Sequence, residues 1–138
     1  MLAYRRLLDL CEDTAPNAKI VTHTYDIAKP SNQGEEFFWG TIKPNPWIYS
    51  YLIDKGIPKK LHLPIVKYML NSFSKRITKL SKEKETKKRL IVVNTKGTLR
   101  PTSKLDWLNE IHPTSRGLKK VYKKIYKEMR GIVPELPS

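Results

Sequence analysis

The stretch "DWLNEIHPTSRG", which runs from Asp106 to Gly117, places a histidine close to two carboxylates and an amide. Histidine is the side chain best suited to general acid–base work near neutral pH, and a carboxylate on its second ring nitrogen fixes the tautomer and stabilises the imidazolium. His112 is therefore a candidate general base, and Asp106 and Glu110 are the candidate carboxylates. The alternative is that this stretch is a plain loop that caps the helix after it.

Helix-prone and strand-prone runs alternate along the chain. Apolar residues at helical spacing, bounded by turn residues, predict helices at Leu2–Glu12, 46–56, 61–84 and from the expected N-cap Thr114 to Gly131. Short β-prone runs predict strands around Ile20 and at Leu90–Asn94. This alternation indicates an α/β fold with a parallel sheet. Ligands bind at the carboxyl ends of such strands, and His112 lies between the second strand and the last helix.

The predicted sheet is incomplete, because only two convincing strands occur in the 138 residues. Parallel strands normally have helices on both faces and neighbouring strands beside them. An open strand edge invites pairing with another chain. We therefore expect either a third strand hidden in a loop or a chain that forms part of a larger sheet.

The composition is strongly basic, with 27 Lys and Arg against 13 Asp and Glu. This charge would attract nucleic acid or another anionic surface, but no nucleic-acid reading motif accompanies it. The single cysteine excludes an internal disulfide framework, and His23 and His62 are expected to be structural. No metal-ligand spacing or glycine-rich phosphate loop occurs, so neither metal nor cofactor is expected. A membrane-spanning run and a signal peptide are not evident either, which predicts a cytoplasmic location.

Several motifs join the histidine motif into one pattern. "PNAKIVTHTYDIAKP", "NPWI" and "IVVNTKGTL" precede "DWLNEIHPTSRG" in that order. Together they resemble the C-terminal half of the SGNH (GDSL-type) hydrolases, in which a histidine followed by proline closes a Ser–His–Asp triad. The resemblance covers about residues 4–130. It implies a single partial domain over residues 1–138: the last two parallel strands, with flanking helices, of a flavodoxin-like three-layer αβα sandwich.

The resemblance also implies roles for individual residues. His112 would take the proton of the serine nucleophile and pass it to the leaving alcohol. The family's acid lies three residues before the histidine, and Asn109 holds that position here. Asp106 is the preferred replacement, and Glu110 is the other candidate. The substrate side would be lined by the residues that follow the first strand and by the amide of the motif, namely Tyr25, Asp26, Trp39 and Asn109.

The family's nucleophile and oxyanion motifs do not occur in this sequence, which contains no Gly-Asp-Ser and no Gly-x-Asn-Asp stretch. We expect one explanation for the missing serine and the missing strand neighbours, namely that an N-terminal half is absent. The chain alone is then expected to be inactive, and the implied partner is an N-terminal SGNH half, with a small ester as substrate. The alternatives are a non-catalytic interaction module, such as a homo-oligomer, and a basic nucleic-acid binder.

Overall fold

The computed structural model describes residues 1–32 and 46–132. Within these residues the chain is a mixed α/β unit with four helices and one two-stranded parallel sheet. The order along the chain is α1 (Leu2–Thr14), β1 (Ile20–His23), α2 (Trp47–Asp54), α3 (Lys59–Leu80), β2 (Leu90–Val93) and α4 (Ser115–Arg130). Every predicted helix and strand is present, with somewhat different ends, so the α/β class indicated by the alternation is confirmed.

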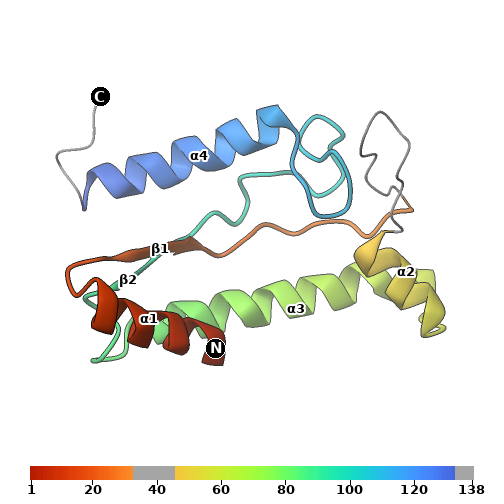
Figure 1. The fold of residues 1–138 in the computed structure, drawn as a ribbon. Coiled ribbons are helices and arrows are strands. Elements are labelled where there is room, and N and C mark those ends of the chain that lie inside the picture. Colours follow the sequence, from red (N-terminus) through yellow and green to blue (C-terminus); the bar gives the residue numbers. More distant parts are fainter. Residues whose placement is uncertain (33–45, 133–138) are drawn as a thin grey trace.

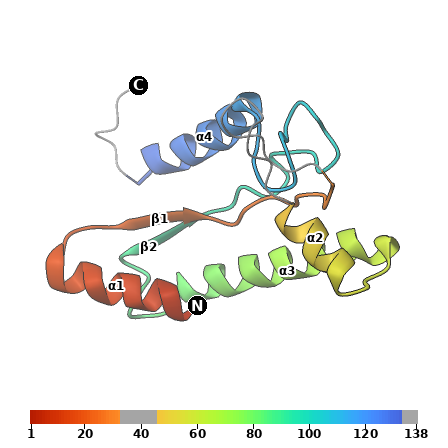
Figure 2. The same ribbon diagram turned by 45° about the vertical axis from the view of Figure 1, so that its right-hand side comes forward.

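The sheet lies between two sets of helices. Its register pairs Ile20–His23 with Leu90–Val93 in parallel. Both ribbon views place α4 on one side of the sheet and α1 and α3 on the other (Figure 1, Figure 2). The carboxyl ends of both strands point toward the loops that lead into α2 and α4, so these loops are the ones able to carry a site.

Within the described part of the chain, β1 pairs with a strand on one edge only. On the inner edge, the N–H of Ile20 donates to Arg89 and the N–H of Thr24 donates to Val93. Because bonding alternates along a strand, the peptide groups of Val21 face away from β2. In residues 1–32 and 46–132, no strand pairs with that edge. The third strand that a parallel sheet normally needs does not lie within the described part of the chain.

The larger apolar cluster lies between the sheet and the helices α1 and α3. It contains Leu8 of α1, Ile77 and Leu80 of α3, and Leu90 of β2. Ile77 and Leu80 come from the apolar stripe that predicted α3, and both are almost completely buried. Met69 of the same stripe is 60% exposed. Burial of each large side chain contributes about 2 kcal/mol, which holds the two helices on the sheet.

A smaller cluster lies on the side of the sheet that α4 covers. Ala28, Leu99 and Trp107 are buried there, and Tyr25 and Val121 pack against them. Four of these residues come from the loops after the strands, and only Val121 belongs to α4. The helix is therefore held in place through the same loops that carry the candidate site.

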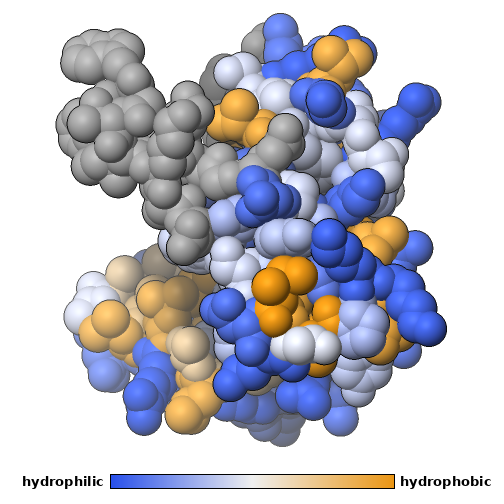
Figure 3. Space-filling model, turned by 90° about the vertical axis from the view of Figure 1, so that its right-hand side faces the viewer, coloured by the Kyte–Doolittle hydropathy of each residue, from blue (hydrophilic) through white to orange (hydrophobic). Residues whose placement is uncertain are grey.

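The apolar stripe of α4 is only partly covered. Leu118 and Tyr122 are 55% and 62% exposed. Hydrophobic side chains also gather over α2 and the start of α3 (Figure 3), where Ile53 and Leu61 are 42% and 43% exposed. None of the described helices combines the length and the apolar character that a membrane crossing requires. Within the described residues, these exposed side chains form two apolar surfaces, one on α4 and one over α2 and the start of α3.

Candidate functional site

His112 lies in a tight loop just before α4, with its side chain exposed. The loop is closed by the N–H of Leu108, which donates to the carbonyl of His112 at 2.8 Å. The ring Nδ1 of His112 lies 3.2 Å from Oδ1 of Asn109. The side chain that meets this ring nitrogen is therefore the amide at the position where the resembled family has its acid.

Two main-chain donors set the orientation of the Asn109 amide. The N–H groups of Ile111 and His112 donate to Oδ1 at 3.0 and 2.8 Å, and only the oxygen of an amide can accept them. The same oxygen lies 3.2 Å from Nδ1, so in the neutral imidazole this contact favours the tautomer that carries its proton on Nδ1. Nε2 is then the unprotonated nitrogen, which is the arrangement that a general base needs.

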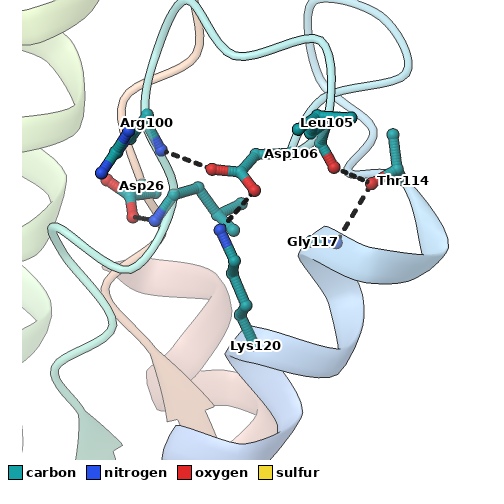
Figure 4. A network of polar contacts seen from close by, with 8 residues as sticks. Asp26, Arg100, Leu105, Asp106, Thr114, Gly117 and Lys120 are labelled. Atoms are coloured by element: carbon teal, nitrogen blue, oxygen red, sulfur yellow. Dashed lines mark hydrogen bonds and ion pairs between the residues drawn. The ribbon is translucent and has the colours of Figure 1, made fainter.

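Asp106 is buried beside the first turns of α4 (Figure 4). Its Oδ1 accepts from Nζ of Lys120 at 2.5 Å, and its Oδ2 accepts from the N–H of Arg100 at 3.0 Å. The hydrogen bond from Lys120, followed by that from Arg100, holds the pKa of Asp106 below its usual value. Both carboxylate oxygens thus have a hydrogen-bond partner, and together the two bonds connect α4 to the loop after β2. The side-chain oxygen observed at Nδ1 of His112 is Oδ1 of Asn109, and the expected carboxylate of Asp106 bonds elsewhere.

The start of α4 follows the sequence prediction. Thr114 is the N-cap: its hydroxyl accepts from the N–H of Gly117 at 3.1 Å and donates to the carbonyl of Leu105 at 2.6 Å (Figure 4). A Cβ at position 117 would overlap the carbonyl oxygen of Asp106, so the close approach of helix and loop requires glycine there. The cap and the glycine together set α4 against the loop that carries His112.

Glu110 is turned toward α2. Its two carboxylate oxygens accept the N–H groups of Ile48 at 2.6 Å and Tyr49 at 2.9 Å. These donors lie in the first turn of α2, where main-chain N–H groups lack partners within the helix and a negative charge is favourable. Glu110 is only 2% exposed. Its contacts tie the His112 loop to α2, and they direct the carboxylate to the helix end.

Asp26 joins the end of β1 to the loop after β2. One carboxylate oxygen accepts from Ile27 at 2.9 Å and from Gly97 at 3.1 Å, and the other accepts from Leu99 at 2.7 Å. All three donors are main-chain N–H groups. The structure thus gives Asp26 a bracing role at the carboxyl ends of the strands. Its expected place on the substrate side stays a prediction.

Tyr25 also meets the site loop. Its hydroxyl donates to the carbonyl of Ile111, the residue directly before His112. Burial raises the pKa of Tyr25, so the hydroxyl remains protonated and available as a donor. Trp39, the third residue expected on the substrate side, lies outside the described residues.

His23 closes one wall of a small cavity between the strand ends and α4. The cavity has a volume of about 100 Å³ and is lined mainly by apolar side chains, among them Leu99 and Leu118. Nδ1 of His23 accepts the N–H of Tyr25 at 3.2 Å and lies 2.9 Å from the hydroxyl of Thr95. Burial lowers the pKa of His23 from 6.5. The ring is therefore neutral at neutral pH and is held by its neighbours, as the structural role predicted for it requires.

The buried ring of His23 gives the chain a pH-dependent stability. Because the pKa of His23 is lower in the folded than in the unfolded chain, the unfolded chain binds its proton first as the pH falls below 6.5. The neutral His23 ring of the folded chain therefore contributes to the free energy of unfolding. This contribution is fully present above pH 6.5 and is lost as the pH falls through the folded-state pKa. We expect the urea midpoint to fall over that window, and to fall less in His23→Gln. An equal fall in both proteins would assign the effect to other groups.

Sequence reasoning missed the role of Asn109, although a signal was present. An asparagine whose side chain accepts main-chain N–H groups two and three residues later forms a local turn, and this geometry depends only on nearby residues. Among the described residues, no group of three or more His, Cys, Asp or Glu side chains could hold a metal ion.

Comparison with known proteins adds no relative to this picture. No family model, no curated protein and no solved structure matches the chain.

Proposed function

We propose that the chain is the C-terminal half of an SGNH-type ester hydrolase, with His112 as its general base and the serine supplied by an N-terminal half. One observation carries the proposal. Nδ1 of His112 lies 3.2 Å from Oδ1 of Asn109, on an exposed loop at the carboxyl ends of two parallel strands. In the neutral ring this contact favours the tautomer with Nε2 as the acceptor, because an amide oxygen can only accept. A serine hydrolase needs this tautomer and this location.

The proposed reaction uses His112 twice. Nε2 accepts the proton of the serine hydroxyl while the serine oxygen forms a bond to the ester carbonyl carbon. The protonated ring then donates that proton to the leaving alcohol as the carbon–oxygen bond of the ester breaks. A water molecule repeats the sequence to release the acid and restore the serine. Asn109 keeps the ring in one orientation through both transfers.

The arrangement of the strands supports the same proposal. In this interpretation β1 and β2 are the last two strands of a larger parallel sheet in a three-layer αβα sandwich. The open edge of β1 would pair with a strand of the partner, and the exposed side chains of Leu118 and Tyr122 on α4 would pack against its helices. Because an open edge and exposed apolar side chains also suit an interaction module without catalysis, that module is the second candidate.

Co-expression with the N-terminal half of an SGNH hydrolase tests the proposal. The partner half must carry the Gly-Asp-Ser and Gly-x-Asn-Asp stretches. We expect the purified pair to hydrolyse p-nitrophenyl acetate, whereas each half alone does not. A pair that co-purifies without hydrolysis would contradict the catalytic proposal and favour the interaction module.

A further inference from the structure

Tyr25 has an unusual main-chain conformation directly after β1. Its φ angle is 59°, and it is the one residue other than glycine with a positive φ in residues 1–32 and 46–132. This left-handed conformation costs a residue with a Cβ about 1–2 kcal/mol. Such a residue persists only where surrounding contacts hold it, so the contacts of Tyr25 indicate what the conformation achieves.

The contacts of Tyr25 fix the direction of its ring. Its main-chain N–H donates to Nδ1 of His23 at 3.2 Å, and its ring stacks on the His23 ring with centroids 5.7 Å apart. Its other neighbour is Trp107, whose ring centroid lies 6.3 Å away at a tilt of 51°. Because both neighbours are themselves in the loops and strand end of the site, the hydroxyl of Tyr25 has a defined position.

The hydroxyl reaches the peptide group that precedes His112. The carbonyl of Ile111 accepts from Tyr25, and the N–H of the same peptide group, which belongs to His112, donates to Asn109 at 2.8 Å. The peptide group is thus held from both sides, by the end of β1 and by the loop itself. The orientation of that peptide sets the direction in which the side chain of His112 leaves the main chain.

We infer that Tyr25 is a positioning residue, which holds the general base His112 in place from the end of the neighbouring strand. Its catalytic consequence rests on the proposed function, whereas its effect on the loop does not. Tyr25 acts through the Ile111 carbonyl and takes no part in proton transfer. This role differs from the substrate-side role expected from its place after the strand.

The test compares Tyr25→Phe with Tyr4→Phe in the isolated chain. Phenylalanine keeps the ring against His23 and removes only the hydroxyl. Tyr4 is a matched control, because its hydroxyl also makes one hydrogen bond, at 2.9 Å to Thr22, away from the site loop. In amide hydrogen exchange followed by NMR, we expect exchange at His112 to accelerate about tenfold in Tyr25→Phe and not in Tyr4→Phe.

The exchange of the Ile77 amide in the core separates local from global effects. Loosening confined to the loop leaves Ile77 unchanged, whereas equal acceleration at Ile77 and His112 would overturn the positioning role. So would unchanged exchange at His112 in Tyr25→Phe. In the co-expressed pair we expect Tyr25→Phe to lower kcat about tenfold at an unchanged KM. A pair without hydrolysis would contradict the proposed function, while the exchange result would still decide the role of Tyr25.

Discussion

His112→Ala is expected to lower the turnover number of the co-expressed ester hydrolase by about four or more decades, which is the scale of loss when a member of a triad is removed. The substitution removes the only group proposed to take the serine proton. Because the side chain of His112 is exposed, alanine there leaves no cavity and should not disturb the fold. The measurement is the rate of p-nitrophenyl acetate hydrolysis at saturating substrate. Activity that survives within tenfold would reject His112 as the base.

His62→Gln is the matched control for this substitution. The ring of His62 is buried and its Nε2 lies 2.8 Å from the carbonyl of Ile57, at the junction of α2 and α3. Changing it is expected to affect stability and to leave the turnover of the folded pair within a few-fold of the original. A loss at His112 that is matched by an equal loss at His62 would indicate general misfolding, since the two histidines share no contact in the proposed mechanism.

The local elements could be predicted because they depend on residues that are neighbours in the sequence. The N-cap Thr114 is recognised by the cap residue and the helical spacing that follows it, and its hydroxyl does accept from Gly117. The strands Ile20–His23 and Leu90–Val93 are recognised by their branched side chains. Their parallel pairing follows from the helices between them.

The assignment of the two carboxylates could not be predicted from neighbours in the sequence. Asp106 accepts a hydrogen bond from Lys120, which lies 14 positions later on α4. Glu110 accepts hydrogen bonds from Ile48 and Tyr49, which lie 62 and 61 positions earlier. Both contacts exist only once the helices have packed. Proximity along the chain therefore made Asp106 and Glu110 the candidate carboxylates for His112, whereas in the fold both bond to helices. The same limit applies to Tyr25, whose partner Ile111 lies 86 positions away.

Asp26→Ala is expected to lower the free energy of unfolding by about 3 kcal/mol. The carboxylate accepts three main-chain N–H groups, and those of Gly97 and Leu99 belong to the loop after β2. Leu99 is only 3% exposed, so its N–H would be left without a partner and without ready access to water. The cost is then the lost charged hydrogen bonds together with the burial of an unsatisfied donor.

Asp26→Asn removes the charge of Asp26 and one of its two accepting oxygens, and it keeps the size of the side chain. An amide has one accepting oxygen, so it can satisfy the donors on one side of Asp26, while its NH₂ group would face a main-chain N–H on the other. We therefore expect asparagine to destabilise the chain nearly as much as alanine does. Asp13→Ala on α1, where the side chain is exposed, should change stability by no more than about 0.5 kcal/mol. Urea unfolding of the three variants decides the matter. If Asp26→Ala matched the small effect of Asp13→Ala, the brace between the two strand ends would not contribute to folding.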